Sequence, residues 1–255
     1  QRDPDVWRLL NQATFGASQG EAANVVAKGI TGWVDDQLSK PVISGYPSSR
    51  YNKIQLNETP DCTTRDPLGN NYPSNSPQAT CVRDHLSLAM VQRDLFTNAT
   101  SNADQLRQRV AWALSQILVI SAVENDLSKA YVMARYQQIM YEEAFGNFET
   151  ILKRVTLSPA MGNWLDSVNN DRPDPTKGRV PNENYAREIM QLFSIGLVEL
   201  KGDGTPLTDA LGEEIPTYDQ DDIKQFARVF TGYTYANPDG SAITKKNGVF
   251  YGADM

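Results

Sequence analysis

The sequence predicts a mainly α protein, a multi-helix globular bundle with long irregular loops and few short strands. Apolar residues recur at the three- and four-residue spacing of an amphipathic helix along most of the chain. Residues that cap helices, and Gly or Pro residues that end them, separate these stretches. Because 40% of the 255 residues are hydrophobic, there is enough apolar material for one large core. We therefore expect a single helical domain over residues 1–255.

The N-terminal part predicts three short helices. The first begins with residues 5–10 and ends near ATFGAS, residues 13–18. The second spans residues 19–28 and stops at Gly29, a residue type that is common just after a helix. The third begins at Thr31, whose hydroxyl can cap it, and ends before Pro41.

The next segment, residues 41–81, has no periodicity and predicts a long irregular loop. Cys62 and Cys81 are the only two cysteines. A disulfide between them would remove about 3 kcal/mol of denatured-state entropy, and such bonds persist in oxidising compartments. We expect this disulfide and export of the protein, with two unpaired buried thiols as the alternative. No signal peptide is visible at the start, QRDPDVWRLL, so the expectation of export includes the expectation that the chain is already processed.

Apolar spacing predicts further helices over residues 82–96, 101–123, 127–145 and 147–157. Asn98 to Asn102 predict the break between the first two of these. The 101–123 helix is apolar on nearly all sides at its centre, so we expect it in the core. Asn147 is expected to cap the last helix.

The C-terminal part alternates between loops and helices. Residues 169–181 predict a loop, directly followed by a helix, and residues 201–216 predict a turn-rich excursion. Thr217 and Gln220 have the spacing of a capping box and predict the start of another helix. Its residues on one apolar side are Ile223, Phe226, Ala227 and Phe230. The tail from Thr231 predicts turns or short strands.

Charge and motifs exclude several function classes. The net charge of −7 and the absence of a basic run argue against a nucleic-acid partner. The longest apolar stretch, Ile117 to Val123, is far shorter than the roughly 20 residues of a membrane span. His85 is the only histidine, which argues against imidazole metal sites and Ser-His-Asp triads, and no nucleotide-binding or hydrolase signature occurs.

Five segments carry a resemblance to a known family. They are RLLNQATFGAS, RQRVAWALSQILVIS, LSPAMGNWLD, PNENYAREIMQLFSIGL and YDQDDIKQFARVFTGY. In this order and spacing they resemble the bacterial family called domain of unknown function 1800, from about residue 7 to the end. The resemblance implies a helical protein exported to the periplasm or the cell exterior, often encoded beside a second exported protein. It also implies a family domain that continues past Met255.

The segment PNENYAREIMQLFSIG, residues 181–196, places charges at the start of an apolar helix that begins near Asn182 or Glu183. Glu183 and Arg187 have the i, i+4 spacing of an ion pair. One interpretation is architectural, with this pair buried or half-buried and Arg107 or Arg109 as further partners.

The other interpretation of these charges is catalytic. Glu183 or Glu188 would serve as a general acid or base or as a metal ligand, and Asp166 would supply a second carboxylate. Two carboxylates suffice for glycoside-type chemistry, although carboxylates are common in all proteins.

Two ligands are also suggested by residue type. Asp171, Asp174 and Asp203 lie in loops and supply the oxygen atoms that Ca²⁺ prefers, with ordinary Asx turns as the alternative. Tyr233 and Tyr235 are candidates for a carbohydrate-binding surface, with a place in the core as the alternative. Sequons at Asn57 and Asn98 fit surface loops.

Two functions follow from these observations. The first is a binding or structural component of an exported envelope or extracellular assembly, with a protein partner. The second is a carboxylate-based hydrolase or lyase acting on a polysaccharide or other envelope polymer through Glu183, Glu188 and Asp166.

Overall fold

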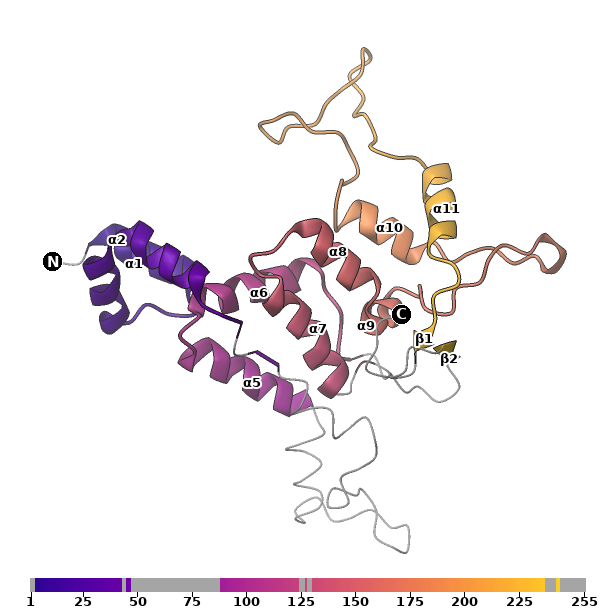
Figure 1. Ribbon diagram of the computed structural model, residues 1–255. Helices are drawn as coiled ribbons and strands as arrows, with labels where there is room; N and C mark the ends of the chain where they lie inside the picture. The colour runs from indigo at the N-terminus through magenta and orange to yellow at the C-terminus, as the bar shows by residue number, and fades with distance from the viewer. Residues whose placement is uncertain are drawn as a thin grey trace, which may run out of the picture. The chain divides into compact units, whose positions relative to one another are not determined.

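The computed structural model is mainly helical (Figure 1), which confirms the predicted fold class. It describes residues 3–42, 45–46, 88–123, 127, 130–236 and 242–243. The chain divides into two compact units where the sequence predicts a single domain. Unit 1 spans residues 1–154 and unit 2 spans residues 155–255. The predicted Cys62–Cys81 disulfide, most of the loop around it, Asn57 and His85 lie outside the described residues.

Unit 1 is a group of helices around α6. Its helices are α1 (Pro4–Ala13), α2 (Gln19–Ser39), α5 (Leu88–Ser101), α6 (Gln105–Ile117) and α7 (Ala130–Glu142), and α8 (Phe148–Thr156) begins in it. Helix α6 packs against α1, α2, α5 and α7 (Figure 1).

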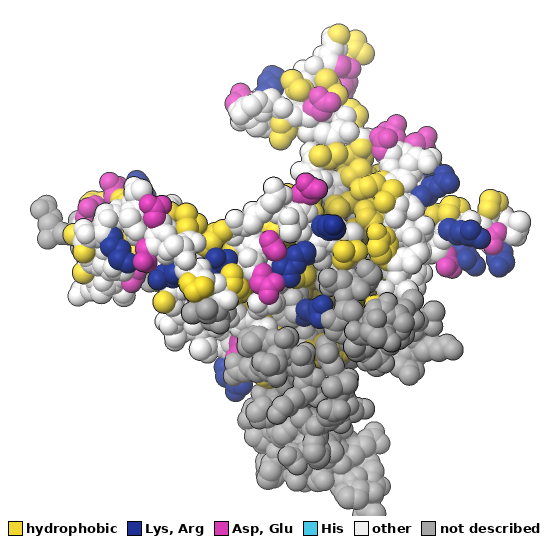
Figure 2. Space-filling model, viewed as in Figure 1, with side chains coloured by type: hydrophobic (Ala, Val, Ile, Leu, Met, Phe, Trp, Pro, Cys, Tyr) yellow, Lys and Arg dark blue, Asp and Glu magenta, His cyan; other side chains and the backbone are white. Residues whose placement is uncertain are grey.

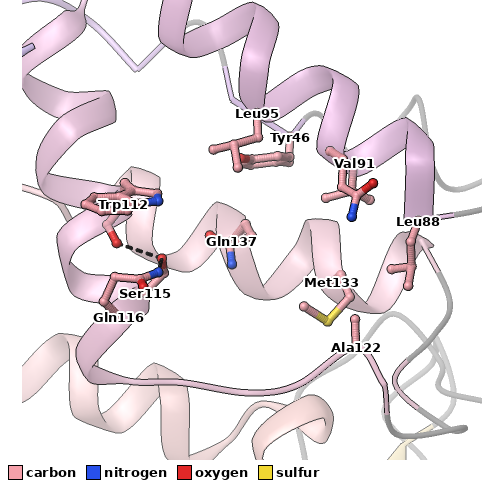
Figure 3. Close-up of a pocket in the computed structure, with 11 residues that line it drawn as sticks. Tyr46, Leu88, Val91, Leu95, Trp112, Ser115, Gln116, Ala122, Met133 and Gln137 are labelled. Atoms are coloured by element: carbon pink, nitrogen blue, oxygen red, sulfur yellow. Dashed lines mark hydrogen bonds between the residues drawn. The ribbon is translucent and has the colours of Figure 1, made fainter. Parts of the chain in front are cut away.

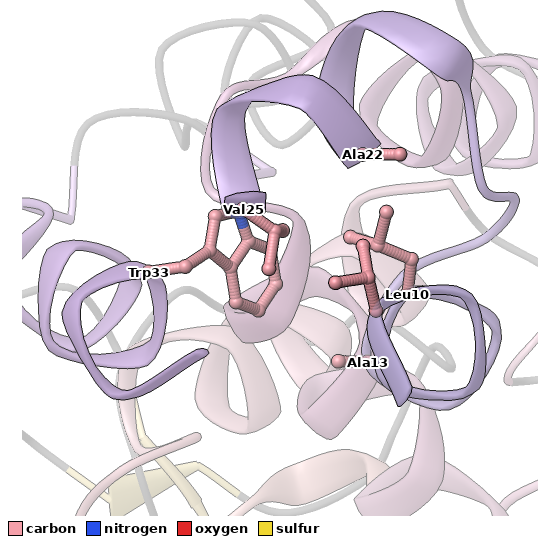
Figure 4. Close-up of a cluster of buried hydrophobic side chains, with 6 residues drawn as sticks. Leu10, Ala13, Ala22, Val25 and Trp33 are labelled. Atoms are coloured by element: carbon pink, nitrogen blue, oxygen red, sulfur yellow. The ribbon is translucent and has the colours of Figure 1, made fainter. Parts of the chain in front are cut away.

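Helices α1 and α2 enclose a small apolar core (Figure 4). Leu10 of α1 packs with Val25 and Trp33 of α2, and all three side chains are fully buried. Within α2, Gly29 has φ 75° and ψ 160°, so the helical path is interrupted where the sequence predicted a helix end. The Trp33 indole N–H donates to the Glu21 carboxylate, which ties the two halves of α2 together.

The predicted break between α5 and α6 is confirmed, but it begins at Asn102 and not at Asn98, because α5 continues to Ser101 and α6 starts at Gln105. The Asn98 side chain is 8% exposed. Its amide donates to the Gly45 carbonyl at 3.2 Å and accepts from the Asn102 amide at 3.0 Å. Tertiary partners thus keep Asn98 inside a helix, and its sequon lies in this buried position, not in a surface loop.

Helix α6 is shorter than the predicted 101–123 helix, and the prediction of an apolar core helix is wrong for its buried face. That face consists of Arg107, Gln108, Ala111 and Ser115, whereas Ile117 is 51% exposed. Apolar residues do recur at helical spacing in α6, but three of its four buried side chains are polar.

The guanidinium of Arg107 explains this inversion. It donates to the carbonyl oxygens of Tyr141 and Glu142, at 3.4 and 3.5 Å, and to that of Lys40 at 3.4 Å. These carbonyls belong to the C-terminal ends of α7 and α2, where helix dipoles favour a cation. The Phe145 ring lies 4.5 Å from the guanidinium carbon. Arg107 therefore fastens α6 to two neighbouring helices.

Two predicted helices agree closely with the structure. The apolar stripe of α7 is buried as predicted, at Tyr131, Val132, Tyr136, Ile139 and Met140. Asn147 caps α8 by accepting from the Glu149 N–H at 2.8 Å. At the end of α8, Arg154 donates to Glu142 at 2.6 Å and to Glu143 at 2.7 Å.

Unit 2 combines short helices with irregular segments. Its elements are α9 (Pro159–Trp164), the 3-10 turn η2 (Pro175–Lys177), α10 (Asn184–Gln191), α11 (Gln220–Val229), β1 (Tyr235–Ala236) and β2 (Ala242–Ile243). Strands β1 and β2 pair antiparallel, with Tyr235 opposite Ile243. Isolated bridges such as Val198 to Pro216 fold the turn-rich excursion back on itself.

The predicted capping box at Thr217 and Gln220 is wrong, because Asp219 is the N-cap of α11. Asp219 accepts from the Asp222 N–H, and Asp222 accepts in return from the Asp219 N–H, both at 2.9 Å. The Thr217 hydroxyl instead donates to the Gly196 carbonyl, which holds Thr217 in the bridged excursion. The predicted apolar side of the helix is confirmed, since Ile223, Ala227 and Phe230 are buried.

No helix in the described part of the chain is long and apolar enough to cross a membrane.

Gly29 and Gly32 offer a matched test of the interruption in α2. Gly29→Ala should destabilise the protein by about 1–3 kcal/mol, because its backbone lies in a region that is nearly reserved for glycine. Gly32→Ala should stabilise it by up to about 1 kcal/mol, because Gly32 lies in a helix where its Cβ would meet only ordinary contacts. Urea denaturation of both variants measures the two effects, and a neutral Gly29→Ala would contradict the described conformation.

Candidate functional site

The three C-terminal segments of the family resemblance meet within unit 2. The first supplies α9 and the turn after it, the second supplies α10, and the third supplies α11 and the residues after it. Helices α10 and α11 pack against each other. The predicted catalytic residues Asp166, Glu183 and Glu188 all belong to these segments.

The turn that follows α9 has an unusual backbone. Asp166 and Asn169 adopt positive φ angles of 58° and 57°, which few residues other than glycine adopt. The Asn169 N–H donates to the Tyr233 carbonyl at 2.8 Å, and its side chain accepts from the Thr234 hydroxyl at 2.6 Å. Such conformations persist where surrounding bonds hold them, and they are enriched at functional sites.

Asn170 fixes the start of α10. Its buried side chain accepts from the Asn182 N–H at 2.8 Å and donates to the Asn182 carbonyl at 3.3 Å. Its own carbonyl accepts from the Gly232 N–H at 2.9 Å. Sequence analysis did not assign Asn170 this role, since the partners are distant in sequence and no local pattern marks such an amide.

Glu183 lies at the junction of α10 and α11. Its Oε2 atom accepts from Arg187 at 3.2 Å and from the Gln220 amide at 2.8 Å. Arg187 also donates to the Gln220 oxygen at 3.3 Å, which closes a triangle of three side chains. The Glu183–Arg187 pair is half-buried. This triangle connects the first turns of the two helices.

Arg107 and Arg109, suggested as further partners of Glu183, make other contacts within unit 1. Arg107 binds the helix-end carbonyls described above. Arg109 donates to the Gln12 carbonyl at 3.3 Å and lies over the rings of Phe15 and Trp112, at 5.3 and 4.8 Å. A contact of either arginine with Glu183 stays a prediction.

The other two candidate carboxylates differ in environment. Asp166 is exposed, and the Asn184 amide donates to it at a long 3.5 Å. Glu188 is half-buried, and no described residue donates to its carboxylate or forms an ion pair with it. On a helix with 3.6 residues per turn, positions 183 and 188 point in directions about 140° apart. The two glutamates therefore do not face a common substrate position on α10.

Two buried hydroxyl groups accompany these residues. The Ser167 hydroxyl and the Tyr218 hydroxyl have no hydrogen-bond partner among the described residues. Neither was singled out from the sequence, because a serine or tyrosine without a motif gives no signal.

Tyr185 anchors α10 from its buried face. Its hydroxyl lies 2.7 Å from the Thr156 hydroxyl, and its ring packs edge-on against Phe230 with centroids 4.9 Å apart. Burial raises the pKa of Tyr185 to about 12, so the side chain is neutral at physiological pH.

The loop aspartates suggested as Ca²⁺ ligands each have a local partner. Asp171 pairs with Arg179 at 2.7 Å, Asp174 accepts from the Thr176 hydroxyl at 2.6 Å, and Asp203 accepts from the Thr205 N–H at 3.0 Å. These hydrogen bonds lower the pKa values of Asp174 and Asp203. No group of three His, Cys, Asp or Glu residues in the described ranges is placed to hold a metal ion. Calcium binding stays a prediction.

Tyr235 does not line a surface, so the suggested carbohydrate platform is wrong for this residue. It is 2% exposed, and its hydroxyl accepts from the Asn163 amide at 3.2 Å. Tyr233, the other tyrosine of the predicted carbohydrate surface, is half-buried. The alternation of these tyrosines places at least Tyr235 in the interior.

Asn170→Ala should destabilise unit 2 by about 1 kcal/mol, because it removes the two part-buried hydrogen bonds that hold Asn182 at the start of α10. Asn184→Ala is the matched control, since it removes only a long, exposed bond and should cost less than about 0.5 kcal/mol. Hydrogen exchange at the Asn182 N–H measures the effect directly. Equal protection in both variants would contradict the role of Asn170.

Comparison with known proteins agrees with the resemblance. A family model described as "Protein of unknown function (DUF1800)" matches residues 8–254. No curated protein and no solved structure matches the chain. Since the match includes all the segments that meet around α10, the chain belongs to the DUF1800 family.

Proposed function

We propose that this protein is exported to the bacterial envelope or the cell exterior and acts there by binding, as a component of an assembly with a protein partner. The observation that carries the binding role is the group of exposed apolar residues after α10, whereas the family-motif charges are accounted for by the triangle of Glu183, Arg187 and Gln220. In this triangle, Glu183 and Arg187 hold α10 against α11. This structural role explains the two charges without a substrate.

Exposed apolar residues after α10 support the binding role. Hydrophobic side chains gather over this part of unit 2 (Figure 2). Leu192, Ile195 and Leu197 are 58%, 54% and 55% exposed. Adjacent exposed apolar side chains are typical of surfaces that meet a partner.

Export is supported by the family resemblance, whose members are exported, and by the placement of the two cysteines around one loop. The family association with a second exported protein supports a protein partner.

A second candidate is a carboxylate-based hydrolase or lyase acting on a polysaccharide or other envelope polymer. Glu188 favours it, because this half-buried carboxylate has no partner among the described residues.

Glutamine variants separate the two candidates. Glu183→Gln should destabilise the protein by about 0.5–1 kcal/mol, because the ion pair with Arg187 is half-exposed. Glu188→Gln should match the control Glu199→Gln, an exposed glutamate of the same unit, in stability. Thermal unfolding and turnover on a panel of polysaccharides measure both properties.

For the binding proposal, we expect no turnover by the parent protein or by any variant. Turnover by the parent that Glu188→Gln abolishes, at unchanged stability, would replace the binding proposal with the enzyme. Turnover that Glu199→Gln abolishes equally would exclude Glu188 as its specific cause.

Fractionation of the native bacterium tests export. We expect the protein in the periplasmic or culture fraction, with Cys62 and Cys81 resistant to alkylation until a reductant is added. Recovery in the cytosolic fraction with two freely alkylated thiols would contradict export.

A further inference from the structure

Unit 1 contains a pocket between three helices (Figure 3). Its volume is about 200 Å³, and its lining comes from α5, α6 and α7, completed by Tyr46 and Ala122. All of these elements belong to unit 1, so the pocket does not depend on unit 2.

The pocket walls are mainly apolar. Helix α5 contributes Leu88, Val91 and Leu95, α6 contributes Trp112, and α7 contributes Met133. Val91 is buried, whereas Leu95 and Met133 are half-buried. Aliphatic and aromatic carbon of this kind favours the apolar part of a ligand.

Trp112 is held in place before any ligand binds. The Arg109 guanidinium lies 4.8 Å from its ring, and Phe15 packs edge-on against it with centroids 6.2 Å apart. A wall fixed in advance lowers the ordering cost of binding.

The polar part of the lining is made of neutral amides. Each of the three helices supplies one glutamine, namely Gln92, Gln116 and Gln137. Gln116 donates weakly to the Ser115 hydroxyl at 3.4 Å. Gln137 is half-buried on α7, and its amide has no hydrogen-bond partner among the described residues. A carboxamide both donates and accepts, so it best matches a ligand group that does the same.

Size and charge narrow the ligand class. A cavity of about 150 Å³ holds a molecule of the size of benzene, so this pocket has room for one ring with a small substituent. None of the lining residues is charged. An ion placed there would lose hydration without gaining a counter-charge.

From these features we propose that the pocket binds a small uncharged molecule that consists of one ring and an amide-like group, with Gln137 pairing to that group. The proposal goes beyond the binding role proposed above, because the pocket lies in unit 1 and the exposed apolar residues that support a protein partner lie in unit 2.

Benzamide is the probe, with benzoate and benzylammonium as charged isosteres. Saturation-transfer NMR on the full chain should show benzamide binding at least about tenfold more tightly than either ion, because the lining offers no counter-charge. Equal affinity for the three probes, or no benzamide binding, would overturn the proposal.

Two variants locate the probe. Met133→Trp should fill the pocket and abolish benzamide binding, whereas the control Thr97→Trp, on an exposed position of α5 outside the lining, should not. Gln137→Leu keeps the side-chain volume nearly constant and should weaken benzamide about five- to tenfold without weakening ethylbenzene.

Each variant has a decisive contrary outcome. Benzamide binding that survives in folded Met133→Trp would overturn the site. If circular dichroism shows that Met133→Trp does not fold, Gln137→Leu decides, and unchanged benzamide affinity in it would overturn the proposal. Failure of these tests leaves the fractionation and turnover results unaffected, so loss of the pocket ligand and loss of the proposed function are distinguishable.

Discussion

Buried backbone groups need hydrogen-bond partners, and this requirement shapes both units of the protein. The helices are short and irregular segments join them, so many backbone groups lie outside helical ladders. In unit 1, Arg107 supplies donors to carbonyls at the ends of α7 and α2. In unit 2, Asn170 supplies both a donor and an acceptor to Asn182. Interior polar side chains thus take the place of longer regular elements.

The buried charges of Asp104 and Arg107 in unit 1 are also stabilised by hydrogen bonds and by helix ends. Asp104 is buried at the N-terminal end of α6, where a helix favours negative charge, and its carboxylate accepts from the Tyr141 hydroxyl at 2.6 Å. Arg107, one turn later, lies at the C-terminal ends of its neighbours. Each charge thus lies at helix ends whose dipoles favour it. Most of the buried residues of α6 are therefore polar, whereas Leu106 and Val110 of its predicted apolar stripe are only half-buried.

Sequence patterns predicted the local part of this architecture and missed the tertiary part. The stripe of α7, the cap at Asn147 and the interruption at Gly29 are recorded in neighbouring residues, so periodicity and capping rules predicted them. Asn98 and Thr217 were misread because their partners, the carbonyls of Gly45 and Gly196, are distant in sequence. Within the candidate site, the i, i+4 spacing predicted the pair of Glu183 and Arg187. The contacts of Asn170 and Gln220 could be identified only in the structure. A local rule cannot reveal which buried amide meets which backbone group.

The charged motif of α10 shows why a recognisable sequence need not mark a catalytic centre. The joint of Glu183, Arg187 and Gln220 gives the charges a structural role, because the three side chains meet between two helices. Glu188 lies about 140° away around the same helix and takes no part in that joint. Support for binding comes instead from two other features, namely the pocket of unit 1, where the Gln137 amide has no hydrogen-bond partner among the described residues, and the exposed apolar residues after α10 in unit 2. The pocket has room for one ring and has no charged lining residue, whereas the residues after α10 form an exposed aliphatic surface. A small ligand and a protein partner would therefore engage different parts of the chain, and neither interaction requires a carboxylate.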